Sequence, residues 1–144
     1  MIYLKEVTKE NYWDCINLSV KEEQKRFVAS NASSIEQSKV QTECIPLGIY
    51  NENLLVGFLM YCMDQDDEEY WIYRMMIDQK YQSMGYGKKA LTNLIKLIIK
   101  DKVHNKIFVG VHKENNAALE FYKRFGFKCD GRVLGKERVM RYDY

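Results

Sequence analysis

Residues 82–88 (QSMGYGK) carry the pattern with the clearest chemical use, because they place two glycines and a lysine between a strand-like and a helix-like segment. The preceding stretch 71–77 favours a strand, and the following stretch 89–100 favours a helix. Glycine lets the backbone pass close to a ligand, and the unpaired N–H groups of a helix's first turn attract anions. A phosphate or pyrophosphate is therefore the expected ligand, and an ordinary polar turn is the alternative.

Two phosphate-binding motifs overlap this loop. A P-loop would need glycine in place of Gln82 and serine or threonine in place of Lys89. The dinucleotide fingerprint Gly-x-Gly-x-x-Ala does begin at Gly85, but residues 78–84 separate it from the strand that it should follow closely. The chain is also short for a doubly wound sheet plus a substrate domain, so a nicotinamide or flavin fold is disfavoured.

As Gln-x-x-Gly-x-Gly after a strand, the loop resembles the acetyl-CoA pyrophosphate loop of the GNAT N-acetyltransferase superfamily. A second resemblance to that superfamily lies at residues 115–127, which have the spacing Asn-x-x-Ala-x-x-x-Tyr-x-x-x-Gly-Phe. The two motifs in this order are much more specific than either one alone. Ser83 departs from many members of the superfamily, which carry glycine at that position.

The resemblance implies acetyl-CoA as the cofactor. In the superfamily, the strand before the glycine loop splays away from the next strand, and its free backbone groups pair with the pantetheine arm. Asn115 would fix the cofactor, although it also suits an ordinary helix cap. Arg124 would meet a CoA phosphate or simply face solvent. The expected cofactor-binding residues are Met75, Met76, Ile77, Gln82, Ser83, Met84, Gly85, Tyr86, Gly87, Lys88, Asn115 and Arg124.

Acetyl transfer to an amine requires that the ammonium lose a proton and that the leaving thiolate gain one. At neutral pH only about one in a thousand amines of pKa ~10 is unprotonated. The resemblance implies that Tyr122 donates the proton to the thiolate. Tyr122 also lies in a helical apolar stripe, so an aromatic residue of the core is the alternative. The strand before the loop offers as a base only Glu69, or its neighbour Glu68, near Tyr73; a solvated turn is the alternative for both glutamates.

Residues 24–35 are similar to the acceptor-side segment of the bacterial spermidine/spermine acetyltransferases within the superfamily. A polyamine carries several ammonium groups and needs several carboxylates along a groove. The expected substrate-binding residues are Glu22, Glu23, Phe27, Asn31 and Glu36, and five acids at 64–69 add charge. The same glutamates also suit a solvated helix face. A GNAT enzyme acting on a peptide, a protein or another small amine stays open, as does a non-catalytic acyl-CoA-binding module.

The composition limits which classes of partner and which location are expected for the protein. The 144 residues are 47% hydrophobic with a net charge of +2 and mixed acids and bases, which predicts one domain, residues 1–144, and argues against nucleic acid. Apolar runs are too short for a membrane span, and the first residues do not form a signal peptide, so a cytoplasmic location is expected. Four cysteines and two histidines lack metal-ligand spacing, so no metal is expected. A homodimer is suggested by analogy with the superfamily.

The elements that must position these residues follow from apolar periodicity and turn signals. Thr8 is expected to cap a first helix that buries Trp13, and Pro46 is expected to end the second helix. The resulting order, β-α-α-β-β-β-α-β-α-β-β, predicts an α/β fold with a mixed, mostly antiparallel sheet and helices on both faces, as in the GNAT fold. The expected strands are 2–7, 47–50, 54–63, 70–77, 106–112, 127–133 and 136–143, and the expected helices are 9–20, 31–45, 86–101 and 117–125.

Overall fold

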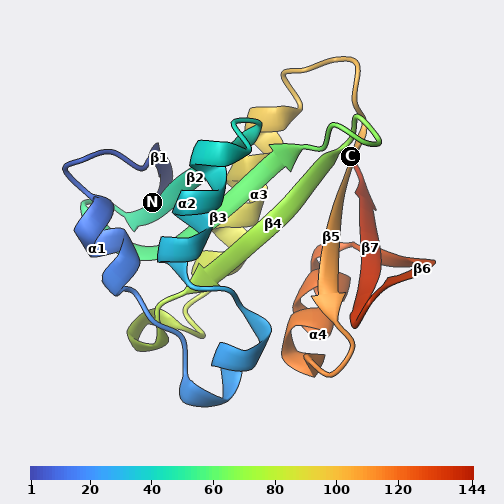
Figure 1. The fold of residues 1–144 in the computed structure, drawn as a ribbon. Helices are drawn as coiled ribbons and strands as arrows, with labels where there is room; N and C mark the ends of the chain where they lie inside the picture. Colours follow the sequence, from blue (N-terminus) through green and yellow to red (C-terminus); the bar gives the residue numbers. More distant parts are fainter.

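The computed structural model describes residues 1–144 and has one seven-stranded sheet in the order β1-β2-β3-β4-β5-β7-β6 (Figure 1). Every neighbouring pair is antiparallel except β4–β5, which is parallel. The predicted mixed, mostly antiparallel sheet is thus confirmed. The strands are β1 Ile2–Glu6, β2 Cys44–Asn51, β3 Leu54–Met63, β4 Tyr70–Ile77, β5 Lys106–His112, β6 Lys128–Leu134 and β7 Glu137–Asp143.

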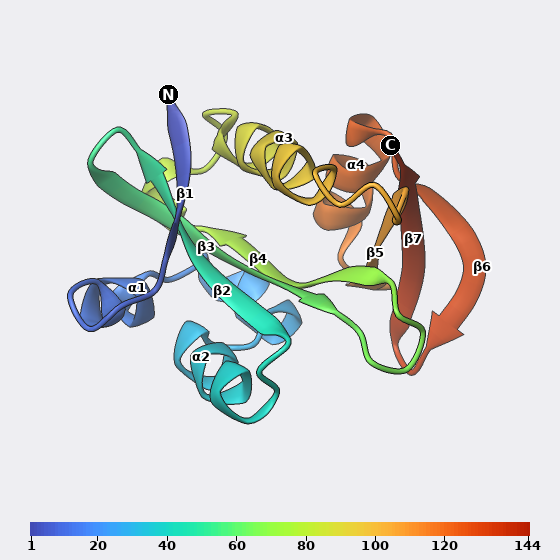
Figure 2. The same ribbon diagram turned by 90° about the horizontal axis from the view of Figure 1, so that it is seen from above.

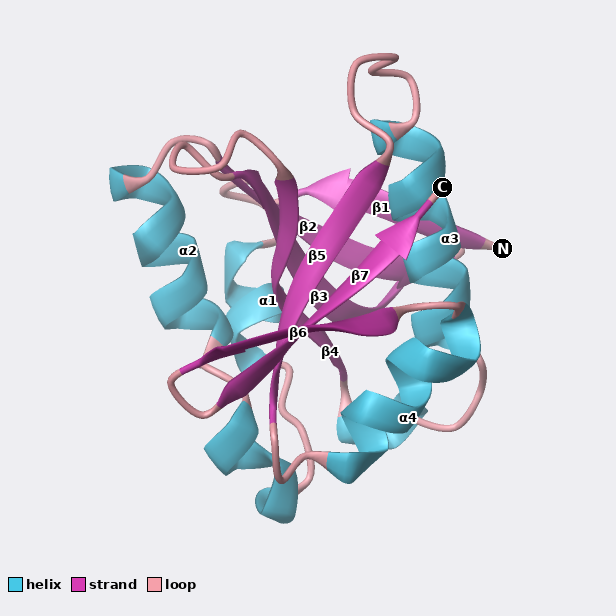
Figure 3. Cartoon of the chain, turned by 90° about the vertical axis from the view of Figure 1, so that its right-hand side faces the viewer, coloured by secondary structure: helices cyan, strands magenta, loops and turns pink.

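The helices cover both faces of the sheet, as predicted. Helices α1 and α2 lie on one face and α3 and α4 on the other (Figure 2), and the view from the β5–β7–β6 side shows the same separation (Figure 3). None of the helices combines the length and the apolar character needed to cross a membrane. The helical elements are α1 Tyr12–Asn17, the 3-10 helix η1 Glu22–Phe27, α2 Asn31–Val40, the 3-10 helix η2 Gln79–Tyr81, α3 Tyr86–Ile98 and α4 Asn116–Phe125.

The first helix is shorter than predicted. It begins at Tyr12, and Thr8 does not cap it: the Thr8 hydroxyl accepts the N–H of Glu10 at 3.2 Å. It ends at Asn17 because the next residues turn toward the loop after β4, where the backbone N–H of Ser19 donates to a carboxylate of that loop at 2.9 Å. The prediction that Trp13 is buried was also wrong, since its side chain is 68% exposed.

The prediction that Pro46 ends the second helix was wrong as well. Helix α2 stops at Val40, and Pro46 lies inside β2, opposite Met60 of β3. Strand β1 pairs with β2 only from Leu47 onward, so Pro46 occupies a part of β2 that has a neighbour on one side alone. A proline is tolerated there because no partner strand needs its missing N–H.

The larger part of the core lies between the sheet and α3 and α4. Helix α3 turns Ala90, Leu91, Leu94 and Ile98 toward the sheet, at helical spacing. Each fully buried leucine contributes about 1.5–3 kcal/mol of transfer free energy. A smaller buried cluster packs under α1 and α2 on the opposite face. Both helix layers are therefore anchored by apolar packing, and the sheet between them is held in place from both sides.

Strands β4 and β5 separate after a short parallel contact. Only Tyr70–Ile72 of β4 pairs with Ile107–Val109 of β5, while β4 stays paired to β3 as far as Ile77 (Figure 1). The β3–β4 register skips Tyr73, and such a bulge bends its strand. The splay that the superfamily resemblance implied is thus present, and the backbone of β4 beyond Ile72 has no strand partner on the β5 side.

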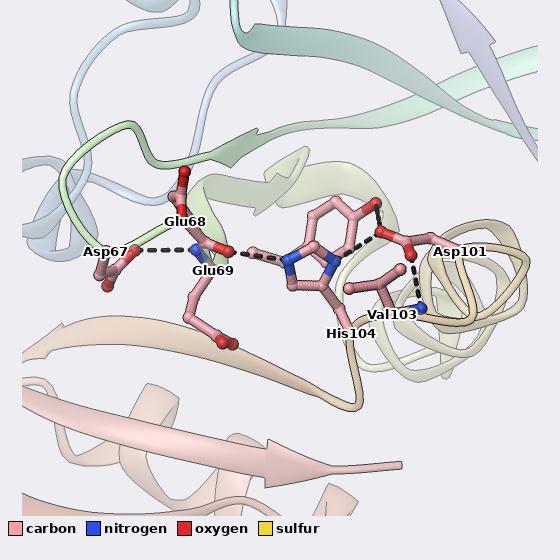
Figure 4. A network of polar contacts seen from close by, with 7 residues as sticks. Asp67, Glu68, Glu69, Asp101, Val103 and His104 are labelled. Carbon is pink, nitrogen blue, oxygen red and sulfur yellow. Dashed lines mark hydrogen bonds and ion pairs between the residues drawn. The ribbon is translucent and has the colours of Figure 1, made fainter.

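At the other end of β4, a polar network ties three segments together (Figure 4). The His104 ring lies with Nδ1 2.6 Å from Asp101 Oδ2 and Nε2 2.8 Å from the carbonyl oxygen of Glu68. The Tyr70 hydroxyl donates to the same Asp101 oxygen at 3.0 Å. Because both ring nitrogens face acceptors, the geometry favours the doubly protonated imidazolium.

The network shifts the pKa values of both ionisable partners. The hydrogen bond to Asp101 raises the pKa of His104 above its ordinary value. The backbone N–H of Val103, followed by His104, lowers the pKa of Asp101 to about 2. The folded state therefore binds the His104 proton more tightly than the unfolded chain does.

We predict that His104→Gln destabilises the protein more at pH 6 than at pH 8.5. The proton-linked contribution of His104 is complete below the unfolded pKa of about 6.5 and is lost as the pH rises through the raised folded pKa. Thermal unfolding of the variant and the wild-type protein at both pH values measures the effect. An equal loss of Tm at the two pH values would show that the imidazolium adds nothing to folding.

Candidate functional site

The loop between β4 and α3 presents backbone N–H groups that the rest of the chain leaves free. Gly85, the residue before α3, has a left-handed backbone with φ +81°, and Ser83 has φ +65°. The backbone hydrogen bonds outside regular elements include none donated by residues 83–88. Ser83 is strained there because it carries a Cβ, which accounts for the glycine that many superfamily members have at this position.

Side chains outside the loop hold it in this shape. The Gln82 amide donates to the carbonyl oxygen of Ile77 at 3.0 Å and to Gln24 Oε1 at 2.9 Å. The buried Asp78 carboxylate accepts the N–H of Lys80 at 3.0 Å through one oxygen and the N–H of Ser19 through the other. The loop is therefore organised before any ligand arrives, which lowers the entropic cost of binding an anion.

A cavity of about 540 Å³ extends from this loop along β4 to α4. Its size suits a cofactor-sized ligand. Of the predicted cofactor-binding residues, only Met84 does not line it; its side chain is exposed. The predicted residues that the structure brings together here are Met75, Met76, Ile77, Gln82, Ser83, Gly85, Tyr86, Gly87, Lys88, Asn115 and Arg124.

Two polar residues of α4 border this cavity. Asn115 caps the helix, since its Oδ1 accepts the N–H of Ala118 at 3.3 Å. This confirms the capping role, and its contact with a cofactor stays a prediction. Arg124 is exposed and lines the cavity, as does Lys88 in the first turn of α3. The two cations leave this end of the cavity suited to phosphate groups.

A second cavity of about 260 Å³ adjoins the splay and is lined by Phe27, Tyr73, Arg74, His112 and Glu137, among others. The two cavities share one wall, formed by Val28, Met75, Asn115, Ala118 and Tyr122. A group held in the first cavity therefore meets a group held in the second at this wall. The arrangement suits a transfer reaction between two ligands that are held in adjoining cavities.

Tyr122 stands in this shared wall and also belongs to the core. Its side chain is 7% exposed, and its ring packs edge-on against Phe121 and Phe127. The hydroxyl has only a weak partner, the sulfur of Met75 at 3.9 Å. Burial raises the pKa of Tyr122 well above its ordinary value, so the hydroxyl keeps its proton at neutral pH.

The structure does not bring Glu69 or Glu68 together with Tyr122. Both precede β4, whereas Tyr122 contacts Met75, six residues farther along the strand and so about 20 Å away. The carbonyl of Glu68 and the network around His104 occupy that distant end (Figure 4). Neither glutamate reaches the shared wall directly, and a role for either as a base acting through water stays a prediction.

The predicted acceptor residues are also dispersed. Glu22 forms an ion pair with Lys25 at 2.8 Å, and Glu36 forms one with Lys39 at 3.5 Å. Neither cavity at the splay is lined by these two glutamates or by Glu23. Asn31 is buried and donates to the carbonyl oxygen of Cys15 at 2.8 Å. Of this set, only Phe27 lines the smaller cavity.

The 3-10 helix η1 crosses the open end of the splay and touches both sides. Gln24 bonds to the loop after β4, as described above, and Arg26 Nη1 lies 2.9 Å from Glu114 Oε2 beyond the end of β5. The Phe27 ring lies 5.0 Å from the ring of His112. The mouth of the site is thus bridged by side chains of η1.

Sequence reasoning missed three charged or titratable residues of the smaller cavity: Arg74, His112 and Glu137. Glu137 comes to the site because β7 inserts beside β5, an arrangement that no local pattern specifies. One signal was available in Gly110, because a glycine inside a strand often marks a close approach by another group.

Comparison with known proteins agrees with the fold and the loop described above. Residues 8–127 match the profile of the acetyltransferase (GNAT) family. The chain is 33% identical to the spermine/spermidine N(1)-acetyltransferase of Bacillus subtilis (strain 168), with 96% of each chain covered. Its fold is similar to that of the PaiA N-acetyltransferase from Thermoplasma acidophilum in complex with coenzyme A, with a TM-score of 0.75, 19% identity and coverage of 100% and 99%.

A further solved structure has a similar fold at lower identity. It is a spermidine N-acetyltransferase from Vibrio cholerae in complex with CoA and spermine, with a TM-score of 0.74, 14% identity and coverage of 97% of this chain and 92% of that one.

We predict that Gly85→Ala weakens acetyl-CoA binding by roughly tenfold, because a left-handed backbone costs an L-residue about 1–2 kcal/mol and the free loop of the variant would relax away from the shape that binds the anion. A Cβ at position 85 would meet no protein atom within 4 Å, so overcrowding within the protein is not the cause. Calorimetric titration with acetyl-CoA measures the change. Gly131→Ala, at a left-handed and equally open glycine in β6, is the matched control and should bind normally. Equal affinity of the Gly85 variant and the wild-type protein would contradict the assignment.

Proposed function

The chain belongs to the acetyltransferase (GNAT) family and is an acetyl-CoA-dependent enzyme, and from that premise we propose that its acceptor is a polyamine such as spermidine or spermine. The observation that carries the proposal is the 33% identity to a spermine/spermidine N(1)-acetyltransferase over 96% of both chains. Cytoplasmic location and a homodimer stay predictions from the sequence.

In this proposal, residues of one cavity bind acetyl-CoA and a residue of the wall shared with the other cavity takes part in the chemistry. The free N–H groups of residues 83–88, with Lys88 and Arg124, would hold the pyrophosphate and phosphate groups of acetyl-CoA. The unpaired edge of β4 near Met75 would accept the pantetheine amides in place of a strand partner. Bound acetyl-CoA supplies the thioester that the amine attacks. Tyr122, in the shared wall, is the proposed proton donor to the leaving sulfur.

The acceptor side is elongated and carries carboxylates. The smaller cavity continues into a hollow of about 270 Å³, and both are lined by Tyr73, Arg74, Gly110 and Glu137. The hollow also includes Asp64, whose Oδ2 accepts the Tyr73 hydroxyl at 3.2 Å. Two carboxylates spaced along one groove suit a flexible chain with several ammonium groups. Glu22, Glu23 and Glu36 lie outside this groove, and their contact with the acceptor stays a prediction.

Arg74 favours a second candidate, an amine that carries a neighbouring carbonyl or carboxylate, such as a peptide amino terminus. Its guanidinium donates to the carbonyl oxygen of Tyr73 at 2.7 Å and to Gln37 Oε1 at 3.4 Å, while its buried Nε has no partner. An acceptor oxygen would satisfy that N–H, because a buried donor without an acceptor is costly. A polyamine offers no such oxygen.

We predict that Tyr122→Phe lowers kcat by roughly 10²-fold while the Kd for acetyl-CoA stays within about twofold, because the variant removes a proton donor and leaves the packing of the ring intact. The hydroxyl has only one weak internal partner, so the Tm should hardly change. Turnover by release of free CoA, together with calorimetric binding of acetyl-CoA, separates the two effects. Equal turnover of the two proteins would remove Tyr122 from the chemistry.

We predict that CoA release from acetyl-CoA is at least about tenfold more efficient, as kcat/KM, with spermine or spermidine than with lysine, an aminoglycoside or an amino-terminal peptide. The polyamine rates should fall with added salt, because carboxylates attract the polycation from solution. Turnover of the peptide with none of the polyamines would favour the Arg74-based candidate and overturn the polyamine proposal.

A further inference from the structure

We propose that the carboxylate of Glu137 is the acceptor-side catalytic group that binds the attacking ammonium and accepts its proton. The inference deepens the proposed function and rests on it, because it requires a cationic amine as acceptor. Neither the sequence motifs nor the residues expected from the superfamily resemblance include this glutamate.

The sheet register places Glu137 at the splay. It is the first residue of β7 and lies opposite His112, the last residue of β5. Its side chain lies back over β5, where a Cβ added to Gly110 would come within 2.6 Å of Glu137 Oε1. Side chains of alternate strand residues share a face, so Gly110 leaves the space through which the carboxylate reaches the smaller cavity. Any larger residue at position 110 would displace it.

Glu137 is also available for a ligand. Its side chain takes part in no hydrogen bond or ion pair, although Lys136 and Arg138 flank it in the sequence and other acids of the chain do pair. It is exposed to solvent and lines the same cavity as Tyr122. A free carboxylate in the wall of a cavity is suited to a cation from solution, because no internal partner has to be displaced.

The other titratable groups that face this cavity are less suited to the role. The Nδ1 atom of His112 accepts the N–H of Glu114 at 3.1 Å, so a neutral His112 ring carries its hydrogen on Nε2 and has no free lone pair. The Tyr73 hydroxyl donates to Asp64, and burial raises the pKa of Tyr73, so it keeps its proton. Arg74 is a cation, and Asp64 lies in the adjoining hollow.

The proton and electron balance of the step is complete. One ammonium proton passes to Glu137, and the freed nitrogen lone pair forms a bond to the acetyl carbonyl carbon. The bond between that carbon and sulfur breaks, its electron pair leaves with sulfur, and Tyr122 gives its proton to the thiolate. The nitrogen then loses a second proton, which restores the Tyr122 hydroxyl through solvent, and keeps the third as the amide N–H. Glu137 releases its proton to solvent, so one proton is produced for each acetyl group transferred.

The test compares Glu137→Gln and Glu137→Asp with the wild-type enzyme. Glu120→Gln, an exposed glutamate on α4 that lines neither cavity, is the matched control. CoA release with spermine is followed from pH 6 to pH 9 at saturating acetyl-CoA, and spermine binding to the CoA-loaded protein is measured by calorimetry. Acetyl-CoA binding is measured for every variant, so that misfolding is detected.

At pH 7, Glu137→Gln should lower kcat/KM for spermine by roughly 10²-fold, with acetyl-CoA affinity unchanged and spermine binding weakened. The deficit should shrink toward pH 9, because an enzyme without the base depends on free amine, whose fraction rises about tenfold per pH unit below a pKa of ~10. Glu137→Asp should recover part of the rate, and Glu120→Gln should match the wild-type enzyme. A purely structural role would give a deficit independent of pH.

The proposal is overturned if Glu137→Gln turns over spermine within about twofold of the wild-type rate at pH 7, or if its deficit is the same at every pH. Failure of the proposed function is distinguishable, because the wild-type enzyme would then not use spermine. In that case the same variants are compared with whichever amine the wild-type enzyme does acetylate. If the wild-type enzyme acetylates no amine, both proposals fall.

Discussion

The break in hydrogen bonding between β4 and β5 is the constraint on which the rest of the structure depends. The two strands pair over three residues each and then part, next to the bulge at Tyr73. Where the pairing ends, backbone N–H and C=O groups of the two strands lose their partners. This costs free energy that a continuous sheet would not lose. The splay persists because the packing of α3 and α4 on one face and of α1 and α2 on the other holds each strand in place. The opening is thus maintained by the helix layers, and in the proposed function the cofactor would complete the pairing.

The opening is closed at its mouth by weaker interactions. Helix η1 spans it with the Gln24–Gln82 amide pair, the exposed ion pair between Arg26 and Glu114, and the aromatic contact of Phe27. Exposed ion pairs contribute about 0–1 kcal/mol, so this bridge is much less stable than the core behind it. The phosphate loop is different, because the buried Asp78 and several backbone bonds fix it. The structure therefore combines a well-fixed loop after β4 with a mouth bridged by weaker contacts.

How much of this the sequence could predict depends on how local each feature is. Residues 82–88 were predicted from the sequence because the strand, loop and helix that form the site follow one another along the chain. Periodicity indicated the individual strands and helices for the same reason, whereas the sheet type and the helix layers were predicted from the element order together with the superfamily resemblance. The predicted length of α1 was wrong because a contact to the distant Asp78 redirects the chain at Ser19. The prediction that Pro46 ends a helix was wrong because the residue lies in a strand, at a position where β1 no longer pairs with β2. Glu137 could not be found, since only the insertion of β7 beside β5 brings it to the splay.

The shared wall between the two cavities has a consequence for the order of events. The two cavities meet at the residues Val28, Met75, Asn115, Ala118 and Tyr122, so two ligands have room to be bound at the same time. The chain also offers no activated thiol there: burial raises the pKa of Cys15 to about 11 and that of Cys44 to about 12, and neither residue lines either cavity. Neither thiol is therefore placed to carry the acetyl group. The proposed transfer would take place within a ternary complex, in which the enzyme holds two partners together long enough to react.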